Sequence, residues 1–246
     1  MKTYCISDIH GHLNNLNKFI KTLNDDDIVY VLGDVVDKGS DSIKTLQLIM
    51  NDKRFKMLLG NHEYMMFQVL SNEIDSYDYS IYYDNWINYN SGDETLKQYE
   101  ALPHYEQLRI LNFIKELPLN YPNIKVNDKT YYLVHSCPHS DIQIKMKDIA
   151  FDDDTICKYV WDRVNPLDRL DINDQVVIAG HTPVQYYIGL TADKVEPVFD
   201  YKNKLGSTNK DIHSAHYIDI DGGLAADLDN SRLIALCLDD LNYRVY

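Results

Sequence analysis

The chain has 246 residues, of which 45% are hydrophobic and 25% charged, a composition typical of a globular protein. Its 24 basic and 38 acidic residues give a formal net charge of −14, which repels nucleic acid and argues against such a partner. No run of about 18 apolar residues is present, so we expect no membrane-spanning segment and no membrane partner. The four cysteines form no CxxC pair and no signal-peptide pattern precedes the first strand, which predicts reduced thiols and a cytoplasmic location.

Strand, loop and helix alternate three times in the first 70 residues. Apolar runs at 3–7, 28–32 and 55–59 predict strands, and each is followed by apolar residues at helical spacing. Three such units in succession predict a parallel sheet with right-handed crossovers, and therefore an α/β fold.

Residues 72–104 interrupt this rhythm, because seven tyrosine and tryptophan side chains alternate there with acidic ones. We interpret this segment as an inserted, mostly helical, tyrosine-rich cap. Two interpretations of its aromatic residues stay open: packing against the main body, or a lid or docking surface. Since the segment before His104 contains no histidine, we expect it to shape substrate access and not to supply metal ligands.

Strands dominate the rest of the chain after a helix that begins at Tyr105 and ends before two prolines. A hairpin is predicted over 124–126 and 130–134, followed by strands at 175–179, 217–220 and 233–238 and a short strand near Tyr243. The continuous order of these elements favours a single domain over residues 1–246.

Metal-binding residue types follow most of the predicted strands. Asp8 and His10 follow the first, Asp34 and Asp37 the second, and Asn61-His62-Glu63 the third, while His135 and His181 each follow a later strand. One such motif is weak evidence, but five in series are specific. Oxygen and imidazole groups at the ends of successive strands are what a two-metal hydrolytic centre requires, and the thiolates of a structural zinc site are missing.

The ordered set Asp-x-His, Gly-Asp-x-x-Asp-x-Gly, Gly-Asn-His-Glu, a single histidine and Gly-His-Thr resembles the metallophosphoesterases of the phosphoprotein phosphatase family, over residues 8–182. The resemblance implies a calcineurin-like fold of two stacked mixed β-sheets flanked by α-helices. It implies two divalent metal ions, most readily Mn²⁺, with Fe or Zn as alternatives. One metal would be held by Asp8, His10 and Asp34, and the other by Asp34, Asn61, His135 and His181.

By the same resemblance Asp34 would bridge two metals, which at a spacing of about 3.5 to 4 Å would supply a hydroxide nucleophile from a bound water. Their positive charge would also offset the repulsion between the acidic chain and a phosphate. We assign His62 as the general acid and Asp37 as the carboxylate that orients it. The alternative for Asp37 is a loop-stabilising turn.

Three residues are expected at the substrate phosphate: Arg163, Lys38 and Asn61. A guanidinium offers two parallel donors to phosphate, although a surface arginine is the alternative interpretation of Arg163. Lys38 stands where the family usually has arginine, so it keeps the charge and loses the fork. Cys137 is interpreted as a small buried side chain. Asp219 and Asp221 are open candidates for orienting a metal-bound histidine.

The function that this resemblance implies is a dinuclear metal-dependent phosphomonoesterase of the bacterial or phage serine/threonine protein phosphatase type. Its partner would be a phosphorylated protein or a small phosphoester. The alternative is a symmetrical diadenosine tetraphosphatase, a branch that typically lacks the second carboxylate of the Gly-Asp loop, present here as Asp37. A third hypothesis is a non-catalytic phosphoprotein-binding protein that uses the tyrosine-rich insertion. The oligomeric state stays open.

Overall fold

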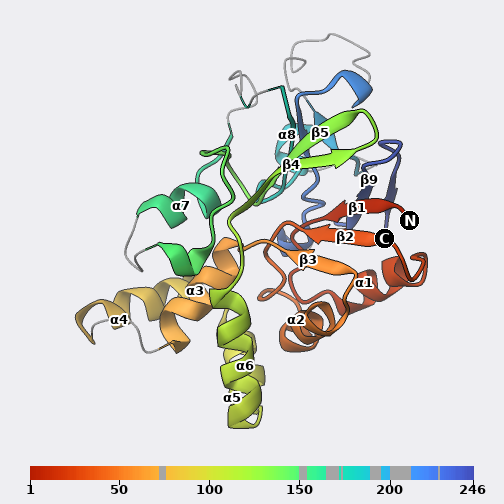
Figure 1. The fold of residues 1–246 in the computed structure, drawn as a ribbon. Helices are drawn as coiled ribbons and strands as arrows, with labels where there is room; N and C mark the ends of the chain where they lie inside the picture. The colour runs from red at the N-terminus through yellow and green to blue at the C-terminus, as the bar shows by residue number, and fades with distance from the viewer. Residues whose placement is uncertain are drawn as a thin grey trace.

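The computed structural model describes residues 1–71, 76–149, 154–164, 172, 174–188, 195–199, 212–226 and 228–246. Within these ranges the strands form two five-stranded sheets with helices packed around them (Figure 1). Each sheet contains both parallel and antiparallel pairs, so the prediction of two mixed sheets is confirmed.

The first sheet has the order β10-β9-β1-β2-β3. Its strands are β1 (Thr3–Ile6), β2 (Ile28–Val31), β3 (Phe55–Met57), β9 (Ile234–Cys237) and β10 (Tyr243–Val245). β1, β2 and β3 are parallel, and they are connected by α1 (Leu13–Ile20) and α2 (Ser42–Asn51). β9 pairs antiparallel with β1, which brings the C-terminal part of the chain against its first strand.

The second sheet has the order β4-β5-β6-β8-β7. Its strands are β4 (Asn120–Val126), β5 (Lys129–Val134), β6 (Val176–Ala179), β7 (Val198–Phe199) and β8 (Tyr217–Asp219). The predicted hairpin is observed, but β4 begins four residues earlier than predicted and shifts register between Tyr121 and Ile124. Asn123 has a φ of 62° there. This irregularity, next to a proline, hid the first half of the strand from a search for regular alternation.

Alternate side chains of the inner strands point to opposite faces and so belong to two hydrophobic clusters. Cys5, Tyr30 and Leu32 pack with Leu133 and Ile178 in the cluster between the sheets. Their neighbours in sequence join the other cluster, which also contains residues of the helices. The two sheets are therefore stacked on a shared core, and the carboxyl ends of β1, β2, β3, β5 and β6 carry the loops of the site.

The remaining helices are α3 (Asn61–Leu70), α4 (Ser76–Tyr83), α5 (Asp93–Glu100), α6 (His104–Lys115), α7 (Asp154–Val160) and α8 (Gln185–Ile188). Between α4 and α5 lies a π-helical segment, Asp84–Tyr89. In Figure 1, α4 extends outward beside α3, while α5 and α6 lie together below the sheets. None of the helices in the described ranges combines the length and apolar character that a bilayer crossing requires.

The insertion at 72–104 is helical in its described part, which excludes residues 72–75. Of its described aromatic side chains, Trp86 and Tyr99 are buried and Tyr82 and Tyr83 are half-buried, whereas Tyr79 and Tyr89 are 43% and 79% exposed. Part of the insertion therefore belongs to the hydrophobic core and part faces solvent. Its role as a cap over a substrate stays a prediction.

Candidate metal centre and acid pair

The loops that follow the strands converge at one edge of the two sheets. Six of the eleven non-glycine residues with positive φ in the described chain lie in these loops: Asp8, His10, Asp34, Asp37, Lys38 and His181. Non-glycine residues rarely adopt this conformation, and they hold it only where the surroundings impose it. Such a concentration of backbone strain at strand ends marks a functional site.

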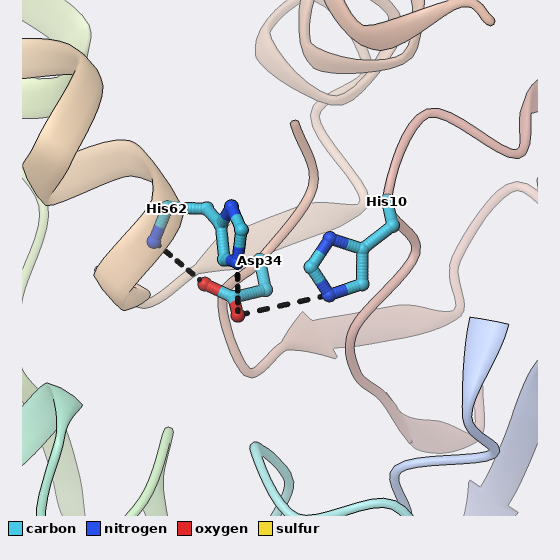
Figure 2. A group of neighbouring side chains, drawn as sticks. All are labelled: His10, Asp34 and His62. Atoms are coloured by element: carbon cyan, nitrogen blue, oxygen red, sulfur yellow. Dashed lines mark hydrogen bonds and ion pairs between the residues drawn. The ribbon is translucent and has the colours of Figure 1, made fainter. Parts of the chain in front are cut away.

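Asp34 lies at the centre of the site (Figure 2). Its Oδ1 accepts a hydrogen bond from the backbone N–H of His62 at 3.0 Å. Its Oδ2 lies 3.5 Å from His135 Nε2 and 3.7 Å from His10 Nε2. One carboxylate oxygen therefore faces imidazoles from both sheets, which is the position of a bridging ligand.

Two groups of potential metal ligands share Asp34. One contains His10, Asp34 and His62, and the other contains Asp34, His135 and His181, with the donor atoms of each group within 4.8 Å of one another. The Asn61 amide oxygen joins the second group, at 3.0 Å from His135 Nε2 and 3.1 Å from His181 Nδ1.

Asp8 stands beside the first group, with its Oδ1 3.9 Å from His10 Nε2. Its Oδ2 accepts hydrogen bonds from the Ser7 hydroxyl and from the backbone N–H of His181, the latter at 3.0 Å. Oδ1 is thereby left to face His10. All six ligands expected from the sequence lie together, and His62 is an additional neighbour whose Nε2 is 4.0 Å from Asp34 Oδ2.

Backbone carbonyls orient two of the imidazoles. His10 Nδ1 lies 3.1 Å from the Val36 carbonyl and His135 Nδ1 lies 2.7 Å from the Leu32 carbonyl. A proton on each Nδ1 leaves Nε2 with a lone pair for a metal.

The two aspartates proposed for such a role have other partners. Asp219 accepts hydrogen bonds from the Tyr217 hydroxyl and the Asp221 N–H, and Asp221 accepts one from the Gly223 N–H. Backbone carbonyls of Val36 and Leu32 therefore orient His10 and His135, which is the role that we considered for carboxylates.

The ionisable groups of the site are buried together, which opposes charge on all of them. Burial and neighbouring carboxylates raise the pKa of Asp8 and Asp34 well above the usual range. Burial lowers the pKa of His135 to about 3 and of His181 to about 2. Neutral imidazoles and carboxylates that need a counter-charge form a donor set that fits two divalent cations, since the set combines oxygen and nitrogen ligands and lacks thiolate.

Next to this donor set lies an acid pair, His62 and Asp37, whose Nδ1 and Oδ2 are 2.7 Å apart. Burial raises the pKa of Asp37 to about 7 and lowers that of His62 to about 3. The two-proton form of the pair, whether written as Asp-H with neutral histidine or as carboxylate with imidazolium, has an N–H at His62 Nε2. That N–H faces the donor set, so the pair can donate a proton there.

Sequence reasoning assigned no role to Glu63, which holds the Gly-Asp loop in place. Its carboxylate accepts hydrogen bonds from the backbone N–H groups of Asp34 at 2.9 Å, Val35 at 2.8 Å and Val36 at 3.1 Å. It also accepts one from the Gly60 N–H at 3.2 Å. A glutamate at the third position of a helix often reaches back to the residue that caps it, and this spacing was the available signal. Trp86 and Thr95, which contact Asp37, carried no comparable signal.

Arg163 and Lys38 flank the site on different sides, and both are exposed. Arg163 donates to the Thr182 hydroxyl at 2.7 Å, and after burial its charge contributes to the low pKa values of His135 and His181. The charge of Lys38 contributes in the same way at His10 and His62. Each cation is thus next to one of the two ligand groups, and phosphate binding by either stays a prediction.

The half-buried Cys137 has a pKa raised by burial to about 11. A thiol with that pKa is neither a nucleophile nor a ready metal ligand at neutral pH. This agrees with the interpretation of Cys137 as a small packing side chain.

Comparison with known proteins gives the same fold. The chain resembles a metallophosphoesterase from Sphaerobacter thermophilus (TM-score 0.58, 16% identity, 100% of this chain and 88% of that chain). It also resembles a protein serine/threonine phosphatase from Saccharomyces cerevisiae with similarity to human phosphatase PP5 (TM-score 0.57, 18% identity, 100% and 79%). At these identities the likeness concerns the fold alone.

Among curated proteins, a symmetrical bis(5'-nucleosyl)-tetraphosphatase of Wigglesworthia glossinidia brevipalpis is 39% identical over 67 residues, which cover 26% of this chain and 25% of that protein. The enzyme of the same name from Proteus mirabilis is 26% identical over 123 residues, 48% and 39% of the two chains. The matches thus span well under half the length of these relatives. The calcineurin-like phosphoesterase family matches residues 1–185. With that match over most of its length, the chain belongs to the calcineurin-like phosphoesterase family of hydrolases.

Proposed function

We propose that this protein is a dinuclear metal-dependent phosphomonoesterase that acts on phosphoserine and phosphothreonine in proteins. The observation that carries the proposal is the acid pair. His62, held by Asp37 at 2.7 Å, directs Nε2 at the same Asp34 oxygen that faces His10 and His135. A proton donor next to the metal ligands is what a poor leaving group, such as a serine or threonine alkoxide, requires.

Two divalent cations, when bound, supply positive charge for the phosphoryl oxygens and an acidified water. Asp8, His10 and Asp34 would hold one of them, and Asp34, Asn61, His135 and His181 the other. The chain's own side chains bind the phosphate and donate the proton. Arg163 and Lys38 bind phosphoryl oxygens from two sides and orient the ester. As the phosphorus–oxygen ester bond breaks, the His62 Nε2 proton passes to the leaving alkoxide, and the pair is left as an Asp37 carboxylate that accepts the Nδ1–H of a neutral imidazole.

Symmetrical diadenosine tetraphosphatase is the second candidate, and the relatives from Wigglesworthia and Proteus favour it. The leaving group in that reaction is a nucleoside diphosphate, which departs as a stable anion and needs a proton donor less than an alkoxide does. The presence of Asp37 beside His62 therefore supports the phosphomonoesterase over this candidate.

A substrate panel separates the two candidates. Protein purified without chelator is supplied with Mn²⁺ and tested on phosphoserine, phosphothreonine and phosphotyrosine peptides and on diadenosine tetraphosphate. The proposal expects the highest kcat/KM on phosphoserine or phosphothreonine peptides, and an Asp34→Asn variant serves as the inactive control. Preference for diadenosine tetraphosphate, with ADP as the only product, would replace the proposal by the second candidate.

A further inference from the structure

The tyrosine-rich insertion reaches the carboxylate of the acid pair through the buried side chain of Trp86. Its indole Nε1–H donates to Asp37 Oδ2 at 2.9 Å, and the same oxygen receives His62 Nδ1 at 2.7 Å. We propose that Trp86 is a positioning residue for the acid pair, and that through it the insertion sets the efficiency of proton donation. This inference rests on the function proposed above and adds a residue that the sequence motifs did not include.

The hydrogen bonds of Asp37 show why its carboxylate needs such a partner. Oδ1 is buried and has no hydrogen-bond partner among the described residues, so Oδ2 receives both N–H donors. A carboxylate held at one oxygen can turn about its Cβ–Cγ bond unless a second contact fixes its plane. The indole provides that contact from a fully buried position, 0% exposed, so its own N–H also depends on Asp37.

The insertion holds the backbone of Asp37 as well. The Asp37 N–H lies 2.9 Å from the Ser42 hydroxyl and 3.2 Å from the Thr95 hydroxyl, and Thr95 belongs to α5. Asp37 has a φ of 69°, a left-handed conformation that costs energy for a residue with a side chain although aspartate tolerates it better than most, and these two hydrogen bonds help to hold it. Trp86 and Thr95 thus fix the side chain and the main chain of the same residue from one inserted segment.

Gly92 leaves the space in which the indole lies. A Cβ on Gly92 would come within 2.4 Å of Trp86 Nε1 and 2.5 Å of Trp86 Cε2. Its φ of −80° is open to any residue, so the backbone conformation does not call for glycine here. Glycine is required because the indole ring approaches so closely. The Gly92 N–H also donates to the Trp86 carbonyl at 3.0 Å.

This geometry identifies two substitutions that disturb one hydrogen bond from opposite sides. Trp86→Phe keeps an aromatic ring and removes the N–H. Gly92→Ala keeps the tryptophan, touches no residue of the acid pair, and forces the indole to shift from the position in which it donates to Asp37. Agreement between the two variants would exclude a simple effect of lost ring volume.

The experiment measures kcat and KM with Mn²⁺ on an alkyl phosphate, phosphoserine peptide, and on an aryl phosphate with a good leaving group. Loss of a group that orients a catalytic residue typically costs about 10- to 100-fold. We expect both variants to lose that factor in kcat on the alkyl substrate, with KM nearly unchanged and a clearly smaller loss on the aryl substrate. Asp37→Asn should remove the effect, so the double variant Asp37→Asn/Trp86→Phe should be no slower than Asp37→Asn alone.

Tyr89→Phe is the matched control, because Tyr89 lies in the same π-helical segment and is 79% exposed. It should behave as the parent.

A second measurement needs neither metal nor substrate, because it follows the NMR signal of the indole N–H itself. The chain has two tryptophans, so protein labelled with ¹⁵N-tryptophan gives two indole N–H signals, and Trp86→Phe identifies one of them. That signal should shift and exchange faster with solvent in Asp37→Asn and in Gly92→Ala.

Several outcomes would overturn the inference. One is that Trp86→Phe and Gly92→Ala keep the parent's kcat on the alkyl substrate. Another is that they lose activity equally on alkyl and aryl substrates, or lose bound metal, since the indole would then be purely structural. If the chemical shift and exchange rate of the Trp86 indole signal are unchanged in Asp37→Asn, the hydrogen bond is absent. A parent with no phosphomonoesterase activity would instead overturn the proposed function, and with it the positioning role.

Discussion

The metal ligands and the acid pair lie side by side, but the fold holds them in different ways. The candidate ligands lie in loops that follow strands of both sheets, and the carbonyls of Val36 and Leu32, in the segment after β2, orient His10 and His135. Asp37 of the acid pair is supported by Trp86 and Thr95, which come from the inserted helices. The strand ends therefore build the candidate metal centre, while the acid pair is supported by an addition to the fold together with Ser42 of α2.

This difference means that binding of metal and donation of a proton can be separated by mutation. A variant in the ligand cluster should lose both functions, because the proton donor has nothing to act on without the metals. A variant in the acid pair should lose only the second. Deleting the insertion is a poor way to separate them, since Trp86 and Tyr99 belong to the hydrophobic core.

The largest effect is expected for Asp34→Asn. The substitution removes the negative charge from the oxygen that faces both ligand groups, so both metals should bind weakly and activity should vanish even in excess Mn²⁺. Metal content by elemental analysis and kcat on phosphoserine peptide measure the result. Asp128→Asn, in the exposed β4–β5 turn, is the matched control and should match the parent. Full metal content in Asp34→Asn would show that Asp34 is not the bridge.

The next effect is expected for His62→Asn, which should retain its metals. Without the proton donor, kcat on an alkyl phosphate should fall by about 10²- to 10⁴-fold. An aryl phosphate leaves with less help, so its loss should be visibly smaller. Equal losses on both substrates, with metal intact, would remove His62 from the acid role and make it a group that orients phosphate or water.

A smaller effect is expected at the two flanking cations. Arg163→Ala should raise KM and lower kcat/KM. The loss of transition-state stabilisation should be about 2 to 3 kcal/mol, the size of a charge-assisted hydrogen-bonded pair. Lys38→Ala is the comparison, and it should cost less because water replaces a point charge on a flexible stem more easily. A large loss of kcat/KM in Lys38→Ala together with no loss in Arg163→Ala would reverse the roles assigned to these two residues.

The smallest effect concerns the stability of the protein without metal. Burial raises the pKa of Asp37, Glu63 and Asp221 to about 7, above the value of about 4 for unfolded carboxyls. The native state therefore holds protons that the unfolded state has released, and its stability falls as pH rises through 7. Unfolded histidines, with pKa near 6.5, are mostly neutral above pH 7 and do not reverse this sign.

We expect the Tm of chelator-treated protein to fall as pH rises from 7 to 8, by at most about 3 °C per pH unit for each proton that the native state still holds. Added Mn²⁺ should flatten this slope, because cations stabilise the ionised carboxylates at Asp8 and Asp34. Scanning calorimetry at several pH values measures both slopes. A Tm that rises with pH in the absence of metal would contradict the assigned pKa directions.

The sequence alone determined the alternation of elements in the first 70 residues, the mixed α/β architecture and the residue types of the ligand set. These features are local: apolar periodicity sets each strand, and the polar residue directly after a strand is carried to the edge of the sheet. The family followed from the order of the motifs, which needs no coordinates. Missed features were irregular ones, such as the early half of β4, where a register shift broke the alternation.

Only the tertiary structure decided which groups support the site. Trp86 is 49 residues from Asp37, and nothing in that spacing indicates a contact. Glu63 is 29 residues from Asp34, and its position in the helix indicates a contact with Gly60 but not one with the Asp34 loop. Carbonyl partners such as that of Leu32 are invisible in a sequence, because every residue carries the same backbone group. Hydrogen bonds between distant segments depend on how the sheets and the insertion pack, and that packing placed the indole of an inserted helix against the carboxylate of the acid pair.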